Sequence, residues 1–155
     1  MGAFQGHAVI ENTETPIPAR LTSYAVPFVD WDRINRISGE IVDSSLRVHQ
    51  ELGPGLLESA YRACLAYELR RRRFGVSEEV GLPVVYDSQC LEIGYRIDIL
   101  VENLVVLEIK SVEAIAPIHK AQLLSYLKLS GRPLGLLLNF NVCRMKDGIV
   151  RMRSG

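Results

Sequence analysis

YRIDILVENLVVLEIKS, residues 95–111, contains two strand-like runs that decide the fold. In each run apolar and charged residues alternate, which is the pattern of a β-strand with one buried face. Three residues, 102–104, separate the runs, and the central one is an asparagine. Because asparagine is a common turn former, the stretch predicts an antiparallel β-hairpin.

The register of this hairpin brings two acids together. Pairing Val101 with Val105 keeps the apolar faces of both strands on one side. Counting outward from that pair places Asp98 opposite Glu108, with Lys110 one step along the same face. Directly opposed residues have Cβ atoms about 4.5–5.5 Å apart, so the two carboxylates repel each other. One interpretation is a solvated face on which basic neighbours screen the two acids. The other is a divalent cation that the two acids bind through oxygen, and the hairpin alone leaves both interpretations open.

Length and composition predict one globular domain without a strong charge bias. The chain has 155 residues, of which 48% are hydrophobic and 23% charged, and this suits a single domain with its own core. Its 18 basic and 18 acidic side chains cancel, so the whole chain does not indicate nucleic-acid binding. Residues 1–32 hold four acids and one base, which leaves 14 acids and 17 bases in residues 33–155. That small excess is compatible with a polyanionic partner.

Cysteine usage and hydropathy predict the compartment. Cys64, Cys90 and Cys143 form no C-x-x-C pair and have no histidine cluster nearby, so a zinc site is not expected. An odd number of scattered thiols favours a reducing cytosol over a secreted disulfide framework. No apolar run reaches the length that crosses a bilayer. We therefore expect a cytoplasmic protein without a membrane partner.

The start of the chain shows no sustained periodicity. Residues 1–32 are interpreted as an N-terminal extension, and residues 33–155 as the folded domain. Helical spacing of apolar residues begins at about Trp31, with Asp32 as the expected N-cap. The Gly-Pro-Gly sequence at 53–55 ends this first helix.

The remaining elements predict a mixed α/β (α+β) domain. Further helices are expected over about 56–73 and 117–130, and strands over about 80–86, 91–101, 105–110 and 133–140. Pro83 indicates an edge position or an irregularity in the first strand. A short hairpin through residues 146–148 is expected to complete the fold. The predicted order is α-α-β-β-β-α-β.

Two features of the second helix have both a structural and a functional interpretation. Glu58 at its start complements the helix dipole and has Arg62 at i+4 as an ion-pair partner. The four bases Arg70, Arg71, Arg72 and Arg73 at its end are typical of a solvated helix C-terminus, and a patch that contacts phosphates is the alternative.

Two polar residues of the third helix also have two readings. Gln122 and Tyr126 are four residues apart, so they share one face. They are interpreted either as a boundary polar residue with a half-buried aromatic or as part of a site. His119, nearer the start of this helix, could face the site or cap the helix, and we expect it to cap the helix.

Together these motifs resemble the PD-(D/E)XK nuclease superfamily. Asp98 followed by E-I-K at 108–110 is similar to its D-x(n)-E-x-K signature on adjacent strands. The string G-L-L-E-S-A-Y at 55–61 resembles the G-x-x-E-x-x-Y motif that names a family of small prokaryotic proteins within the superfamily. V-H-Q-E-L-G-P at 48–54 is similar to the V-H-x-x-L-G-P lead-in of that family. Q-x-x-x-Y at 122–126 resembles a motif of the RecB-type branch that borders the active site.

The resemblance covers about residues 34–153 and implies a restriction-endonuclease-like core, in which helices flank a mixed central sheet. It implies metal-dependent hydrolysis of phosphodiester bonds in nucleic acid, with DNA as the expected substrate. Asp98, Glu108 and the backbone carbonyl of Ile109 would hold Mg²⁺ or Mn²⁺ through oxygen. Lys110 would act on the attacking water, and Glu58 would add a metal contact, directly or through water.

Gln122 and Tyr126 would position the phosphate or the acids in such an enzyme. A fold does not by itself establish activity, so a catalytically inactive module that binds a protein or nucleic-acid partner is the alternative function. Metal dependence separates the two. The sequence leaves open whether the chain is a homodimer and whether its substrate is single- or double-stranded.

Overall fold

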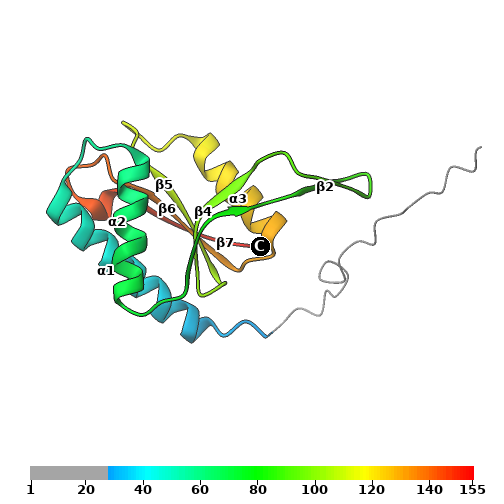
Figure 1. The fold of residues 1–155 in the computed structure, drawn as a ribbon, viewed down its shortest axis with the longest axis horizontal. Helices are drawn as coiled ribbons and strands as arrows, with labels where there is room; N and C mark the ends of the chain where they lie inside the picture. The colour runs from blue at the N-terminus through cyan, green and yellow to red at the C-terminus, as the bar shows by residue number, and fades with distance from the viewer. Residues whose placement is uncertain (1–27) are drawn as a thin grey trace, which may run out of the picture.

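Residues 28–155 are described by a computed structural model, in which helices cover both faces of a mixed β-sheet (Figure 1). The elements are α1 (Trp31–Leu52), α2 (Glu58–Arg71), β1 (Val76–Gly81), β2 (Val84–Tyr86), β3 (Gln89–Leu91), β4 (Arg96–Val101), β5 (Val105–Lys110), α3 (Pro117–Ser130), β6 (Leu134–Asn139), the 3₁₀ helix η2 (Met145–Gly148) and β7 (Ile149–Arg153). Most of the predicted N-terminal extension, residues 1–27, lies outside the described residues, and α1 already includes Trp31 and Asp32.

The main sheet has five strands in the order β1-β4-β5-β6-β7. Only β5 and β6 pair in parallel, and α3 connects them across one face of the sheet. The other neighbours are antiparallel. Val101 pairs with Val105 in the β4–β5 hairpin, so the register predicted from the alternation of apolar residues is confirmed.

Apolar side chains pack on both faces of this sheet and form two clusters. One cluster joins α1 and α2 to residues such as Ile99, Leu107 and Leu136 of the central strands. The other joins α3 to the opposite face through residues that include Leu100 and Val106. Because both faces are buried, β5 and β6 are apolar almost throughout, as expected for strands covered on two sides.

Local capping defines the ends of the helices. The side chain of Asp30 accepts a hydrogen bond of 2.9 Å from the backbone N–H of Arg33, so Asp30 is the N-cap of α1 and the prediction of Asp32 was wrong. Asp32 lies in the first turn of the helix. α2 is shorter than the predicted 56–73, whereas α3 has the predicted bounds and ends before Gly131.

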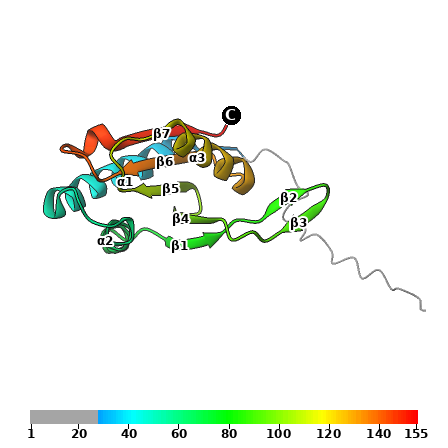
Figure 2. The same cartoon turned by 90° about the horizontal axis from the view of Figure 1, so that it is seen from above.

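The two long strands predicted over 80–86 and 91–101 are each interrupted. β1 and β4 pair in the main sheet, whereas β2 and β3 form a separate two-stranded sheet that extends from the body as an arm (Figure 2). Pro83 lacks a backbone N–H, and Gly94 adopts a φ of 84° that favours glycine, so the ladder breaks at these positions. Five strands therefore precede α3 instead of the predicted three.

The end of the chain agrees with the sequence in outline. β6 is fully buried, as its continuous apolar run predicts, and the chain then turns through η2 into β7, which pairs with β6. The connection at residues 146–148 is a 3₁₀ turn and not a tight two-residue hairpin. Within residues 28–155 no helix combines the length and the apolar character required to cross a membrane.

The turn before β7 has no room for a side chain at Gly148. A Cβ added at Gly148 would overlap the backbone oxygen of Asn139, so Gly148→Ala should lower the free energy of unfolding by about 1–3 kcal/mol. Gly81→Ala is the matched control, because nothing lies within 4 Å of a Cβ at that position. Urea unfolding monitored by circular dichroism measures both, and equal stability of the two variants would contradict the packing described.

Candidate active site

Asp98 and Glu108 lie next to each other on β4 and β5, in the sheet face that α3 covers. The regular β4–β5 ladder ends at the pair Ile99 and Leu107. Beyond it, an oxygen of the Asp98 carboxylate accepts the backbone N–H of Ile109 at 2.7 Å, and the Glu108 carboxylate accepts the N–H of Asp98 at 3.4 Å. Each acid therefore receives a hydrogen bond from the backbone of the opposite strand, and these two bonds hold the carboxylates next to each other.

The ladder on the other side of β4 is also interrupted at Asp98. β1 and β4 pair at Glu78 with Ile99 and at Val80 with Ile97, but the pair between Glu79 and Asp98 is missing. Glu79 has a φ of 50°, which is uncommon for a residue other than glycine. A local break in a ladder re-aims side chains, and here it occurs on both sides of one acid.

The two carboxylates occupy an environment that disfavours their charged forms. Glu108 is only 3% exposed, and its burial together with the charge of Asp98 raises its pKa to about 8. Burial also raises the pKa of Asp98, although the N–H of Ile109 and the charge of Lys110 oppose that shift. Within residues 28–155 neither carboxylate forms an ion pair with a basic side chain.

Lys110 ends β5 on the same face as the acids and is half-buried. Its charge lowers the pKa of both Asp98 and Glu108. Its backbone carbonyl accepts the N–H of Phe140 at 2.9 Å, so this end of β5 is held against the segment that follows β6. The side chain is therefore close enough to influence both acids without neutralising either in a direct pair.

Gln122 and Tyr126 approach the acids from α3. The amide of Gln122 donates to the hydroxyl of Tyr126 at 3.1 Å, so the two residues share a face as predicted. Tyr126 is 6% exposed, and its pKa is raised mainly by burial and further by the charges of Glu108 and Asp98. The phenol therefore lies close to the acid pair, where it can orient a carboxylate or a bound phosphate.

His119 accepts the N–H of Ala116 through Nδ1 at 3.0 Å and caps the helix, as expected.

Glu58 is the first residue of α2 and is exposed to solvent. Its carboxylate accepts the backbone N–H of Ser111 at 3.4 Å, and its charge raises the pKa of Asp98. The predicted ion pair with Arg62 does not form, because Arg62 contacts Glu79 at 3.3 Å and lies near Asp98. Glu58 is thus free to face the end of β5 that carries Lys110.

Tyr61 fixes the loop that places Glu58. Its hydroxyl donates to the carbonyl of Gly53 at 2.5 Å and accepts the N–H of Leu56 at 3.1 Å. Its ring stacks on Phe140 with centroids 4.5 Å apart. Gly55 within this loop has a φ of 100°, a conformation that favours glycine. The three residues of the motif at 55–61 therefore have distinct local roles. Gly55 allows the turn, Glu58 supplies the acid, and Tyr61 holds the loop in place.

Two residues that the sequence analysis missed support the same corner of the site. The hydroxyl of Ser111 donates to the carbonyl of Leu56 at 2.6 Å and so connects β5 to the loop before α2. Asn139 is 1% exposed and forms two hydrogen bonds with the backbone of Val112, at 2.9 and 3.1 Å. A polar residue at the end of an apolar strand is a signal that could have identified Asn139, because buried amides require partners. No comparable signal marks Ser111.

The arginines at the end of α2 are mostly engaged with carboxylates. Arg71 and Arg72 each approach the buried Glu68 to 3.0 Å, and Arg70 approaches Glu78 to 2.9 Å. These contacts support the interpretation as a charged helix end, and contact of the four arginines with nucleic acid stays a prediction.

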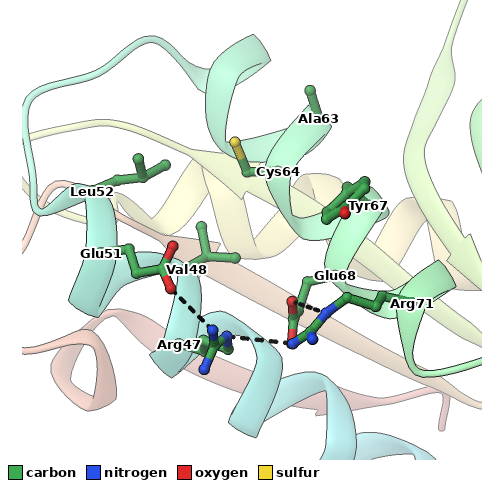
Figure 3. A pocket seen from close by; sticks show the side chains of 9 residues that line it. All are labelled: Arg47, Val48, Glu51, Leu52, Ala63, Cys64, Tyr67, Glu68 and Arg71. Carbon is green, nitrogen blue, oxygen red and sulfur yellow. Dashed lines mark hydrogen bonds and ion pairs between the residues drawn. The ribbon is translucent and has the colours of Figure 1, made fainter.

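A cavity of about 470 Å³ lies between α1 and α2 near these arginines (Figure 3). Arg47 extends between Glu51 at 3.1 Å and Glu68 at 3.7 Å, so the charged groups that line the cavity pair with one another. None of the predicted catalytic residues lines it. The cavity is therefore separate from the acid pair.

The donor set at the acid pair suits a hard divalent cation. Asp98 and Glu108 supply carboxylate oxygens, and their burial without a basic partner disfavours the ionised forms, which a bound cation would stabilise. Across the described residues no three His, Cys, Asp or Glu side chains gather closely enough to hold a metal by themselves. Mg²⁺ is commonly held by one or two carboxylates together with waters and substrate phosphates, so two acids are sufficient for such a site. The carbonyl of Ile109 as a third ligand stays a prediction.

The raised pKa of Glu108 predicts a pH-dependent stability. Between pH 4.5 and about 8 the unfolded chain has lost the Glu108 proton while the folded chain keeps it, so stability should fall as the pH rises. Glu108→Gln removes this penalty. In EDTA the variant should gain stability relative to wild type at pH 8 and show little of that gain at pH 4.5.

Urea unfolding at the two pH values measures this difference. Glu113→Gln is the matched control, because Glu113 is exposed. A difference between wild type and Glu108→Gln that is the same at both pH values would show that Glu108 is not held protonated by its surroundings.

Comparison with known proteins agrees with this arrangement. A family model described as the PD-(D/E)XK nuclease superfamily matches residues 35–152. No curated protein and no solved structure matches the chain. The matched range includes α1 from residue 35 onward, all of α2, the β4–β5 hairpin with its two acids, and α3 with Gln122 and Tyr126. The chain therefore belongs to the PD-(D/E)XK nuclease superfamily.

Proposed function

We propose that this chain is a cytoplasmic nuclease of the GxxExxY type that hydrolyses phosphodiester bonds of DNA with Mg²⁺ or Mn²⁺. The observation that carries the proposal is the pair of neighbouring acids, Asp98 and Glu108, buried without a basic ion-pair partner beside Lys110. Such a pair is costly for a purely structural strand, because burial and mutual repulsion both oppose its charge. A divalent cation would stabilise the ionised form of both acids and would attract the negatively charged phosphate.

Asp98, Glu108 and the carbonyl of Ile109 would hold the ion. When bound, Mg²⁺ or Mn²⁺ polarises the phosphate and stabilises the negative charge of the transition state. The N–H of Ile109 already holds the Asp98 carboxylate in one orientation, at 2.7 Å, so this ligand is arranged before the ion arrives. Preorganised ligands reduce the reorganisation required during the reaction.

Lys110 would orient the attacking water and stabilise the developing negative charge of the phosphate. Glu58, whose carboxylate accepts the backbone N–H of Ser111, would add a further metal contact, directly or through water. Gln122 and Tyr126, joined by their own hydrogen bond, would position the phosphate or the acids. These side chains come from three elements, α2, β5 and α3, so the site depends on the packing of α2 and α3 on opposite sides of the strand end.

The first test is the role of Lys110. Lys110→Met should still bind metal and nucleic acid but should lose turnover by about 10²-fold or more, the usual scale for removing a proton-transfer or charge-stabilising group. Single-turnover cleavage of labelled DNA at saturating Mg²⁺ or Mn²⁺, with an EDTA arm, measures this loss.

Two further variants separate catalysis from charge. Lys110→Arg keeps the positive charge, but its guanidinium has a different shape and exchanges a proton poorly, so it should recover little activity. Lys146→Met removes an exposed lysine from η2 and should cut at the wild-type rate. Wild-type cleavage by Lys110→Met would remove the central residue from the proposed mechanism.

The second test is the metal site. Asp98→Ala and Glu108→Ala should each abolish binding of Mg²⁺ or Mn²⁺ in titration calorimetry while the circular dichroism spectrum stays native. Removing one of two repelling acids relieves their repulsion, so the metal-free variants should be at least as stable as wild type in thermal melts. Unchanged metal binding together with lower stability would contradict the site.

The substrate is tested with the same wild-type protein. Labelled single- and double-stranded DNA and RNA, each with Mg²⁺, Mn²⁺ or EDTA, distinguish a DNA nuclease from a ribonuclease. Binding of a strand without metal-dependent cleavage would instead favour a non-catalytic nuclease-fold module. Sedimentation of the protein alone decides whether the active species is a monomer or a homodimer.

A further inference from the structure

A second cavity lies where α3 meets the base of the β2–β3 arm. Its volume is about 470 Å³, within the range of about 300–1,000 Å³ of pockets that bind small molecules. Residues of both segments line it, including Tyr95, Ile118, His119, Gln122, Ser125 and Tyr126. In both cartoon views the arm leaves the body of the protein close to α3 (Figures 1 and 2).

Aromatic rings form part of the cavity wall. The ring of Tyr95 lies 6.2 Å from that of Tyr126, with an angle of 54° between the two planes. Tyr126 is buried against the sheet, whereas Tyr95 is 47% exposed, so the Tyr95 ring is accessible to a ligand. The backbone of Tyr95 is held, because its carbonyl accepts the N–H of Leu82 at 2.8 Å. An exposed aromatic ring on a fixed backbone is a suitable platform for stacking.

The remaining wall offers hydrogen-bonding groups without acidic ones. Gln122 and Ser125 supply an amide and a hydroxyl. His119 uses Nδ1 as an acceptor for the N–H of Ala116, so in the neutral ring Nε2 carries the proton and can donate. Among residues 28–155, none of those that line the cavity is an aspartate or glutamate, and the exposed bases Arg96 and Lys120 are next to lining residues in the sequence. Aromatic faces with polar groups at the edge are the features that recognise a nucleobase.

The cavity shares two residues with the proposed acid site. Gln122 and Tyr126 line the cavity, and the hydroxyl of Tyr126 is close enough to Glu108 and Asp98 for their charges to raise its pKa. A strand whose phosphate lies at the acid pair would therefore place a neighbouring nucleotide beside Tyr126. The base of that nucleotide can reach the ring of Tyr95.

We propose that this cavity binds an unpaired nucleobase next to the phosphodiester that is cut, which makes single-stranded nucleic acid the substrate class. The inference rests on the proposed hydrolytic function, because that function places the strand at the acids. Bases within a duplex are stacked and paired, so they reach such a cavity only after unstacking, at a cost of a few kcal/mol. Single strands avoid that cost.

The test measures binding and cleavage with one set of variants. Fluorescence anisotropy with short labelled oligonucleotides, in EDTA and with Ca²⁺ in place of Mg²⁺, should give tighter binding of single strands than of duplexes. Tyr95→Ala should raise Kd for the single strand about 5- to 150-fold, which corresponds to the roughly 1–3 kcal/mol measured per stacked base. Tyr95→Phe keeps the ring and should bind like wild type.

Tyr86→Ala is the matched control, because Tyr86 is a 74% exposed tyrosine of the same arm that does not line the cavity. Its Kd should equal that of wild type. Oligonucleotides with 2-aminopurine at successive positions provide a second readout. Quenching on binding should be greatest at the position next to the cut, and Tyr95→Ala should abolish it.

The outcomes separate the two proposals. Metal-dependent cleavage by wild type with an unchanged Kd for Tyr95→Ala, or with duplexes bound as tightly as single strands, overturns the cavity and leaves the nuclease function standing. Binding that depends on Tyr95 without any cleavage supports binding of a base in the cavity, but overturns the hydrolytic function and with it the position next to a cut. Failure of wild type to bind any oligonucleotide overturns both.

Discussion

The burial of two carboxylates side by side on antiparallel strands is the constraint on which the site depends. Glu108 is almost fully buried, and Asp98 is partly buried beside it. Neither would occupy this position if the strands could slip, because a shift of one residue would turn the apolar side chains of both strands to the wrong face. Packing of both faces of β5 makes that shift costly. The hydrophobic core therefore supplies the free energy that keeps the two acids together.

Hydrogen bonds from the backbone decide how the acids are presented. The β4–β5 ladder ends before Asp98 and the β1–β4 ladder skips it, and the N–H groups of Asp98 and Ile109 bind side-chain oxygens instead of carbonyls. Ser111 and Asn139 then tie the chain beyond β5 to α2 and to β6. Satisfied polar groups hold a unique geometry, whereas unsatisfied ones would be costly in this buried region. The end of β5 thus departs from the regular ladder while its polar groups are held by hydrogen bonds.

The sequence predicts the parts of this arrangement that depend on local pattern. Alternation around residues 95–111 gives the hairpin register, and helical spacing gives α3 within its observed bounds. The arm was not predicted, because Pro83 and Gly94 break two apparently continuous strands and the pairing of the pieces depends on tertiary context. Ser111 contacts a residue 55 positions earlier, and no local pattern indicates such a partner. The partners of Arg62 and Arg72 were unpredictable for the same reason, because competing acids lie on distant elements.

The arm and the cavity at its base are structurally separable. A two-stranded hairpin is marginally stable by itself, and the arm exposes Val85 and Ile93 to solvent. Tyr95, however, is held where the arm joins the main sheet, through the hydrogen bond from Leu82, which is itself buried against α3. The cavity wall therefore belongs to the rim of the sheet and to α3. Tyr95 is thus tied to the sheet independently of the arm, so the position of its ring relative to Tyr126 depends on the sheet and α3 and not on the arm.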